Sequence, residues 1–227
     1  NTKTDWIFLE GTPHIAKLLI SDMDPTMIEQ ECIDEIGKTI GKGEQIALIT
    51  KQTMEGKLPF EEALKKRVAL LQGVAVSTLE EIIANRITPM AGAKELISTM
   101  RQKGTLCVLV SGGFSFFTKH IAEHLSFDHH HANQLEIKQG HLTGNLTPPL
   151  LGSQSKLDYL EHYRKQLTID YADILALGDG ANDLAMLQKA GLGIAYHPKP
   201  ILAEAIEKKI FHSPLTAALY IQGIGKE

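Results

Sequence analysis

The sequence predicts an α/β fold in which a mainly parallel sheet carries helices on both faces and a small helical domain is inserted after the first strand. Two patterns indicate this fold. From residue 89 onward, short apolar runs alternate with amphipathic helical stretches, which is typical of a parallel sheet. From residue 29 to about residue 85, apolar residues instead recur at steps of three and four, as short amphipathic helices require.

The elements can be placed in order along the chain. Residues 18–21 (LLIS) are expected to form the first strand, because a run of apolar or small residues suits the middle of a parallel sheet. Breaks near residues 41–43 and 56–59 divide the inserted helices. The later elements are expected to be helix 93–103, strand 105–110, helix 115–124, an irregular hairpin at 134–146, helix 155–167, strand 173–177, helix 182–189, strand 192–195 and helix 200–207.

The helical insert sets the expected domain boundaries. We expect residues 16–34 and 89–227 to form the core and residues 35–88 to form a helical cap. Residues 1–15 contain no complete motif and begin with Asn, so we interpret them as an N-terminal leader or the remnant of a removed regulatory domain.

Composition argues against several classes of partner. The 227 residues include 23 basic and 27 acidic side chains, a formal net charge of −4, and they contain no basic block, so we expect no nucleic-acid partner. No apolar run is long enough to cross a bilayer and the start shows no signal-peptide pattern, so we expect no membrane partner and a cytoplasmic location.

Cysteines and clustered histidines receive no chemical role. Cys32 and Cys107 lie in apolar stretches, which favours buried, reduced thiols. The three histidines at 129–131 would point to alternate faces of an extended segment, so a polar turn or a strand edge is favoured over a metal site.

Two aspartates follow the first strand. Residues two apart on an extended backbone point the same way, so Asp22 and Asp24 present their carboxylates side by side. Ligands of parallel sheets bind beyond the carboxyl ends of the strands, which places the pair for chemistry. A lone Asp-x-Asp is more often a solvated turn or a helix cap, so the choice depends on other segments.

Two further segments carry weaker signals. The second core strand runs into Ser111, Gly112 and Gly113, whose open backbone could hold a phosphate, although most such triplets are plain turns. Lys156 lies in the first turn of its helix and opposes the helix dipole. A negatively charged partner would explain that position, whereas a solvated surface lysine is the commoner case.

The segment GDGAND at residues 178–183 carries the strongest signal. It follows a buried strand, and its glycines permit a tight turn that no side chain obstructs. Asp179 is therefore free to reach a metal ion or a substrate, and Asp183 lies four residues further on, near the start of a helix.

Taken in order, the four motifs resemble the haloacid dehalogenase (HAD) superfamily of phosphotransferases. Within it, EQECIDEIG, SGGFSFFT and GDGANDLAMLQKAGLGIAYHPKP are similar to the phosphoserine phosphatase family, over about residues 16–218. The resemblance implies a Rossmann-like HAD core with a cap and a magnesium-dependent hydrolase that converts O-phospho-L-serine to L-serine and phosphate, the last step of serine biosynthesis. Pro25 departs from the family, which usually has Ser there, but Pro is compatible with extended geometry at Asp24.

The resemblance assigns roles to the motif residues. Asp22 would attack phosphorus and form an aspartyl-phosphate, while Asp24 would protonate the leaving oxygen and later activate water. The phosphoryl oxygens would be held by Ser111, Gly112, Gly113 and Lys156, and Asn182 matches a polar contact near the phosphate.

Carboxylates that converge on a dianionic phosphate require a cation. Each like-charge contact near 4 Å costs about 4 kcal/mol at an effective dielectric of ~20. Mg²⁺ prefers hard oxygen ligands, and the resemblance gives it the side chains of Asp22 and Asp179 and the backbone carbonyl of Asp24, with Asp183 in support.

The resemblance assigns substrate choice to the cap. Glu31 matches the partner of the substrate ammonium and Arg67 the partner of its carboxylate, while Met54 and Phe60 match apolar positions that close over the site. The implied partner is a small molecule, phosphoserine, and a homodimer is a candidate assembly.

Three alternatives share part of this pattern. A HAD phosphatase or phosphotransferase that acts on another small phosphomonoester would keep all four motifs. A signalling receiver domain also combines a phospho-accepting Asp with a Lys and acidic metal ligands, but it lacks the second Asp of the pair and the helical insert. A catalytically silent homologue is disfavoured because every expected reactive side chain is present.

Overall fold

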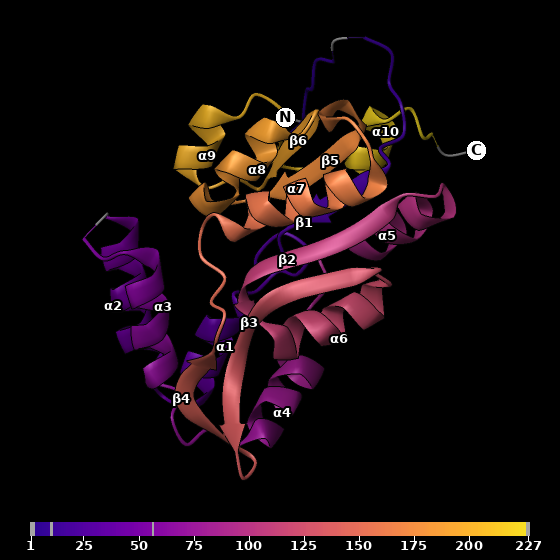
Figure 1. Cartoon of the computed structure of the whole chain (residues 1–227). Helices are drawn as coiled ribbons and strands as arrows, with labels where there is room; N and C mark the ends of the chain where they lie inside the picture. Colours follow the sequence, from indigo (N-terminus) through magenta and orange to yellow (C-terminus); the bar gives the residue numbers. More distant parts are fainter. Residues whose placement is uncertain (1–2, 10, 56, 226–227) are drawn as a thin grey trace.

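The computed structural model describes residues 3–9, 11–55 and 57–225. Within them, seven strands form one sheet in the order β4-β3-β2-β1-β5-β6-β7 (Figure 1). Neighbouring strands run parallel except β3 and β4, which form an antiparallel hairpin. The strands are β1 Leu18–Ser21, β2 Leu106–Phe114, β3 His129–Lys138, β4 His141–Thr147, β5 Ile174–Gly178, β6 Leu192–Tyr196 and β7 Lys209–Ile210. The predicted α/β class is therefore confirmed.

Helices cover both faces of the sheet. They are α1 Cys32–Thr39, α2 Gly43–Met54, α3 Phe60–Ala69, α4 Val76–Arg86, α5 Ala93–Gln102, α6 Ser115–Leu125, α7 Ser155–Leu167, α8 Leu184–Lys189, α9 Pro200–Ala205 and α10 Ala217–Ile221, with 3₁₀ turns η1 Tyr171–Asp173 and η2 Ala181–Asp183. In the described part of the chain, no helix is long and apolar enough to span a membrane.

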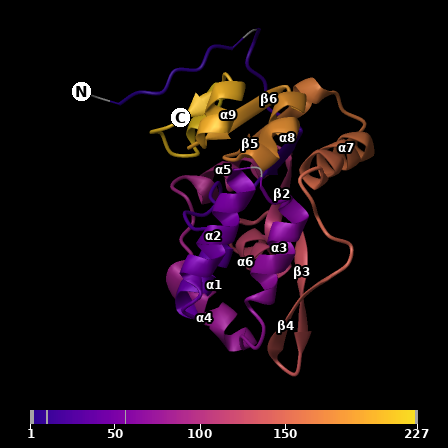
Figure 2. The ribbon, with the colours of Figure 1, turned by 90° about the vertical axis from the view of Figure 1, so that its left-hand side faces the viewer.

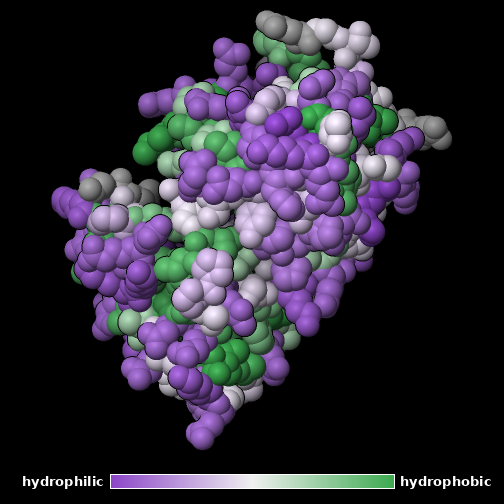
Figure 3. Space-filling model, viewed as in Figure 1, coloured by the Kyte–Doolittle hydropathy of each residue, from purple (hydrophilic) through white to green (hydrophobic). Residues whose placement is uncertain are grey.

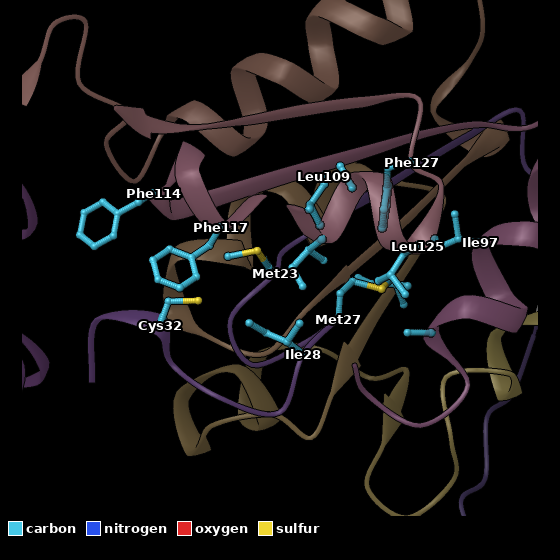
Figure 4. Packing of buried hydrophobic residues seen from close by; sticks show 14 of the residues in the cluster. Met23, Met27, Ile28, Cys32, Ile97, Leu109, Phe114, Phe117, Leu125 and Phe127 are labelled. Carbon is cyan, nitrogen blue, oxygen red and sulfur yellow. The ribbon is translucent and has the colours of Figure 1, made fainter. Parts of the chain in front are cut away.

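Alternation along β1 divides the core between the two faces. Leu19 points toward the cluster formed with α5 and α6, whereas Leu18 and Ile20 point toward the cluster formed with α7, α8 and α9. Figure 4 shows the first cluster, where Met23 lies near Phe117 and Met27 lies near Leu125. Each such buried side chain stabilises the fold by about 1.5–3 kcal/mol. Packing on both faces of the sheet therefore fixes β1, the strand that leads into Asp22 and Asp24.

Two strands are longer than the sequence predicts. β2 continues through Gly112 and Gly113 to Phe114, because the glycines remain extended instead of turning into α6. β3 begins at His129, and its first three residues pair with β2 in parallel before the strand meets β4. The polar histidines thus form part of the sheet, which an apolar pattern does not reveal.

Helices α1–α4 lie beside the sheet toward the β3–β4 hairpin (Figures 1 and 2). Residues 73–76, which join α3 to α4, exchange backbone hydrogen bonds of 2.8–2.9 Å with residues 140–142 at the hairpin tip. At Gly144 in β4 an added Cβ would lie 3.1 Å from Gln72, so glycine permits this close approach. The helical insert therefore packs on the hairpin as well as joining the core.

Candidate active site

The carboxyl ends of β1, β2 and β5 meet at one edge of the sheet. β1 pairs in parallel with β2 on one side and with β5 on the other. Beyond the strand end, the Asp22 N–H donates to the Leu177 carbonyl over 3.0 Å. Parallel pairing brings Asp22 and Asp179, which follow β1 and β5, to the same edge as Ser111 in the last part of β2, as the sequence predicts.

A group of buried charges lies at this edge. Asp22, Asp179 and Asp183 are 3%, 2% and 0% exposed, and their carboxylate oxygens lie within 4.8 Å of one another. The Lys156 ammonium lies 2.7 Å from Asp22 Oδ1 and also contacts Asp183 Oδ1. Lys156 is itself buried, so its place in the first turn of α7 is explained by these carboxylates.

Asp183 fixes the loop that carries Asp179. Its Oδ2 accepts hydrogen bonds from the backbone N–H groups of Asp179 and Gly180, over 3.1 and 3.0 Å. A Cβ on Gly178 would lie 2.4 Å from Asp183 Cγ, so only glycine leaves room for this side chain. The glycines of the GDGAND segment therefore allow the loop to close around Asp183.

The buried charges perturb one another. Burial, followed by the negative charge of Asp183, raises the pKa of Asp22 well above its usual range, and Lys156 opposes this rise. Burial lowers the pKa of Lys156, but the carboxylates of Asp183 and Asp22 raise it by more, so the pKa ends above its usual value. Lys156 therefore stays charged between its two acidic partners.

Asp24 has a different environment from Asp22. Its Oδ2 accepts a hydrogen bond from the Cys32 N–H over 3.2 Å, whereas its buried Oδ1 has no hydrogen-bond partner among the described residues. The residue as a whole is partly exposed, but its carboxyl group is enclosed. Burial, and then the nearby Glu31, raise the pKa of Asp24 to about 8, so the carboxyl is mostly protonated at neutral pH.

A small cavity adjoins these acids at the end of β2. Ser111 Oγ accepts a hydrogen bond from the Gly113 N–H over 2.9 Å. A Cβ on Gly112 would lie 3.3 Å from the Phe60 ring, and one on Gly113 would lie 3.3 Å from Asp24 Oδ2. The two glycines thus let Phe60 and Asp24 approach the strand. The cavity is lined by Phe60, Val110, Ser111, Gly112, Leu151, Gly152, Ser153, Ser155, Lys156 and Asn182.

A larger cavity of about 460 Å³ opens in front of the acids. In the space-filling view, a notch in the surface separates α9 from the end of α2 (Figure 3). The cavity brings together nine residues singled out from the sequence: Asp22, Asp24, Glu31, Phe60, Arg67, Ser111, Gly112, Gly113 and Asn182. The side chain of Met54, also singled out, lies outside the described part of the structure.

Arg67 lines the larger cavity and, within the described part of the chain, keeps one donor unpaired. Its Nη1 donates to Thr50 Oγ1 over 3.4 Å, and its buried Nε has no hydrogen-bond partner among the described residues. Burial lowers the pKa of Arg67, while the charges of Glu31 and Asp34 oppose that change. A half-buried guanidinium with a free N–H is suited to an anionic group of a ligand.

Sequence reasoning missed Lys199, which follows β6. Its ammonium lies 2.9 Å from Asp179 Oδ2 and 3.2 Å from Glu31 Oε1. Burial raises the pKa of Asp179 to about 6, and Lys199 limits the rise. The usable signal was the strand order: β6 neighbours β5, so the segment after β6 reaches the same edge as Asp179.

The acidic group suits a divalent cation. Asp179 Oδ2 is buried, and its partner among the described residues is the Lys199 ammonium at 2.9 Å. Three carboxylates close together supply the hard oxygen ligands that Mg²⁺ prefers, and the two nearby ammonium groups, Lys156 and Lys199, are fewer than the carboxylates. The residues present are therefore compatible with a metal ion bound at Asp22 and Asp179.

Comparisons with known proteins agree with this geometry. A family model described as haloacid dehalogenase-like hydrolase matches residues 19–188. The chain is 43% identical over 197 residues to a phosphoserine phosphatase of Methanocaldococcus jannaschii, covering 85% of this chain and 93% of the relative. It is 39% identical over 194 residues to a phosphoserine phosphatase of Archaeoglobus fulgidus, where it covers 86% of its own length but spans only 56% of the relative.

Solved structures give the same match. A substrate-bound phosphoserine phosphatase complex superposes with a TM-score of 0.84 at 41% identity, covering 90% of this chain and 97% of that one. A phospho-aspartyl intermediate analogue of phosphoserine phosphatase superposes with a TM-score of 0.83, also at 41% identity, over 90% of this chain and 98% of that one.

Proposed function

Because the chain belongs to the haloacid dehalogenase-like hydrolase family, we propose that it is a magnesium-dependent phosphatase that converts O-phospho-L-serine to L-serine and phosphate. The observation that carries the proposal is the buried contact of Lys156 with Asp22 and Asp183, beside a second carboxyl, Asp24, at the end of β1. Relatives and solved structures about 40% identical are named for this substrate.

Asp22 is the proposed nucleophile. Its carboxylate attacks phosphorus and forms an aspartyl-phosphate, which divides one difficult displacement into two easier ones. Lys156, 2.7 Å away, holds the carboxylate in place and stabilises the charge of the transferring group.

Asp24 is the proposed acid and base. With a pKa of about 8 it carries a proton at neutral pH, so it can donate to the leaving serine oxygen. The resulting carboxylate then takes a proton from the water that hydrolyses the aspartyl-phosphate. Its buried Oδ1, free of protein hydrogen bonds, is the atom available for these transfers.

The phosphoryl group is assigned to the smaller cavity and its rim. Hydroxyl, backbone N–H and ammonium donors there face the end of β2, where no side chain on the glycines obstructs an anion. The proposed donors are Ser111, Gly112, Gly113, Lys156 and Asn182.

Mg²⁺ is the proposed metal, held by the side chains of Asp22 and Asp179 and the carbonyl of Asp24. When bound, it would offset the negative charge of the carboxylates and the phosphate. Asp183 supports the site by orienting the Asp179 loop through its hydrogen bonds to two backbone N–H groups.

The amino-acid part of the substrate is assigned to the larger cavity. Glu31 accepts the ammonium, and the guanidinium of Arg67 binds the carboxylate. Phe60, which lies against Gly112, helps to exclude water, and we assign Met54 the same role.

We also propose a core of residues 16–34 and 89–227 with a cap of residues 35–88. A cytoplasmic location and a homodimer are proposed as well, and light scattering tests the homodimer.

Phosphate release from a panel of phosphorylated amino acids and sugars tests the proposal. We expect phosphoserine to react fastest, only when Mg²⁺ is present, and excess chelator to stop the reaction. Asp22→Asn serves as the control for contaminating phosphatases. Faster release from a sugar phosphate, or transfer to an added alcohol, would instead support a HAD phosphatase or phosphotransferase for another phosphomonoester.

A further inference from the structure

Lys199 is a charged residue of the site that the mechanism above does not use. Its ammonium lies 2.9 Å from Asp179 Oδ2 and 3.2 Å from Glu31 Oε1. Asp179 is buried, whereas the side chains of Lys199 and Glu31 are 42% and 40% exposed. The ammonium therefore links a buried carboxylate of the acidic group to a carboxylate on the wall of the larger cavity.

The backbone fixes where this side chain begins. The Lys199 N–H donates to the Asp179 carbonyl over 2.8 Å. Pro200, the first residue of α9, keeps Lys199 extended, with φ −64° and ψ 153°. Tyr196, at the end of β6, is 1% exposed and anchors the N-terminal end of the segment that leads to Lys199. The contact with Asp179 is thus supported by fixed main chain, although the ammonium itself can move.

We propose that Lys199 is a positioning residue that competes with the metal ion for Asp179 and is kept near the site by Glu31. The inference rests on the metal site in the proposed function. Asp179 Oδ2 cannot hold an ammonium at 2.9 Å and a divalent cation at the same time without strong repulsion between the two cations. Because Lys199 is half exposed and already paired with Glu31, it can leave Asp179 without becoming an unpaired buried charge.

The link to Glu31 gives that carboxylate two cationic partners. A carboxylate has about four lone-pair sites, so Glu31 can accept from Lys199 and from a substrate ammonium together. In the described part of the chain, Lys199 is the residue that forms an ion pair with Glu31. Through Lys199, the affinity of Asp179 for the metal ion is linked to Glu31, the carboxylate that is assigned to the substrate ammonium.

Calorimetric titration of the protein with Mg²⁺, without substrate, tests the competition. We expect Lys199→Met to bind Mg²⁺ about two- to fivefold tighter than the parent, the size expected when a partly exposed ion pair is removed. Lys199→Arg keeps the charge and should stay close to the parent. Lys103→Met, which removes the same charge from an exposed position at the end of α5, is the matched control and should change nothing.

The outcomes separate this proposal from the proposed function. Unchanged or weaker Mg²⁺ binding by Lys199→Met, in a protein whose circular dichroism and metal-free Tm match the parent, would overturn the competition alone. A parent that binds no Mg²⁺ would refute the metal site and the competition with it.

A double-mutant cycle tests the link to Glu31. Glu31→Gln should weaken Mg²⁺ binding in the parent, because Lys199 then remains on Asp179. The same substitution should have a smaller effect in the Lys199→Met background. Equal effects in both backgrounds would show that Glu31 does not act through Lys199.

Discussion

The buried ammonium of Lys156 offers a test of the charge arrangement that is independent of any substrate. Lys156 contacts Asp22 and Asp183, and all three residues are at most 3% exposed. Lys156→Met keeps most of the apolar stem and removes the charge, which leaves two buried carboxylates without their cation. Breaking a buried ion pair from one side destabilises a protein by about 3–5 kcal/mol.

The expected loss is large enough to measure by thermal unfolding. At about 2–4 °C per kcal/mol for a chain of this size, Tm of the metal-free protein should fall by roughly 6–20 °C. The loss should be larger at pH 8 than at pH 5. Without the ammonium the pKa of Asp22 rises further, so at lower pH this carboxyl takes up a proton and no longer needs a partner.

Lys165→Met is the matched control, because Lys165 is an exposed residue of the same helix, α7. A surface change of this kind should alter the unfolding free energy by no more than about 0.5 kcal/mol. The buried charge arrangement would be wrong if Lys156→Met had the same Tm as the parent. It would also be wrong if the substitution lowered Tm more at pH 5 than at pH 8.

Three further outcomes are expected. Asp22→Asn should abolish turnover, because an amide cannot form the acyl-phosphate; labelled phosphate trapped on another residue would contradict the assignment. Arg67→Ala should lower kcat/KM for phosphoserine roughly 10- to 150-fold, the value of a charge-assisted hydrogen bond, and leave phosphoethanolamine nearly unchanged; equal losses would remove Arg67 from substrate recognition. Burial and the neighbouring histidines lower the pKa of His131 to about 4, so the fold resists its protonation and stability falls as pH drops from about 6.5 to 4. After discounting for the half-exposed ring, the free energy of unfolding should fall by about 1–2 kcal/mol. Urea unfolding at pH 7 and pH 4.5 should show a smaller fall for His131→Gln than for the parent, and an identical fall in both would refute this role of His131.

The core was predictable because its strands are short apolar runs separated by helices of regular period. The strand expected at 173–177 is observed at Ile174–Gly178, and the helix expected at 155–167 has the same bounds in the structure. In each case local pattern and tertiary packing agree, so the residues themselves indicate the element. The acidic motifs at the ends of β1 and β5 could be located for the same reason.

β3 shows where the pattern fails. Its first three residues are histidines, which give no apolar run, yet they pair with β2. His131 stacks on Tyr159 at 3.8 Å and shares a 2.8 Å hydrogen bond with the Tyr163 hydroxyl. Partners on α7 thus satisfy the polar ring, and such a contact between distant segments leaves no periodic signal in the sequence.

Lys199 was missed for a related reason. Its partner Glu31 is 168 positions away in the chain, and only the order of strands in the sheet brings the two together. A lysine before a proline reads as an ordinary surface residue until β6 is known to lie beside β5.

The backbone contact between residues 73–76 and the hairpin tip has a consequence for the order of synthesis. Residues 140–142 are synthesised about 65 residues after residues 73–76, with which they pair. The N–H and C=O groups of residues 73–76 therefore lack these hydrogen-bond partners until the hairpin has been synthesised. Contacts between such distant positions form slowly, because a long loop has to close first. The helical insert therefore cannot complete its hydrogen bonds as an early, separate unit, and it reaches its final form only when the hairpin that follows β2 has emerged.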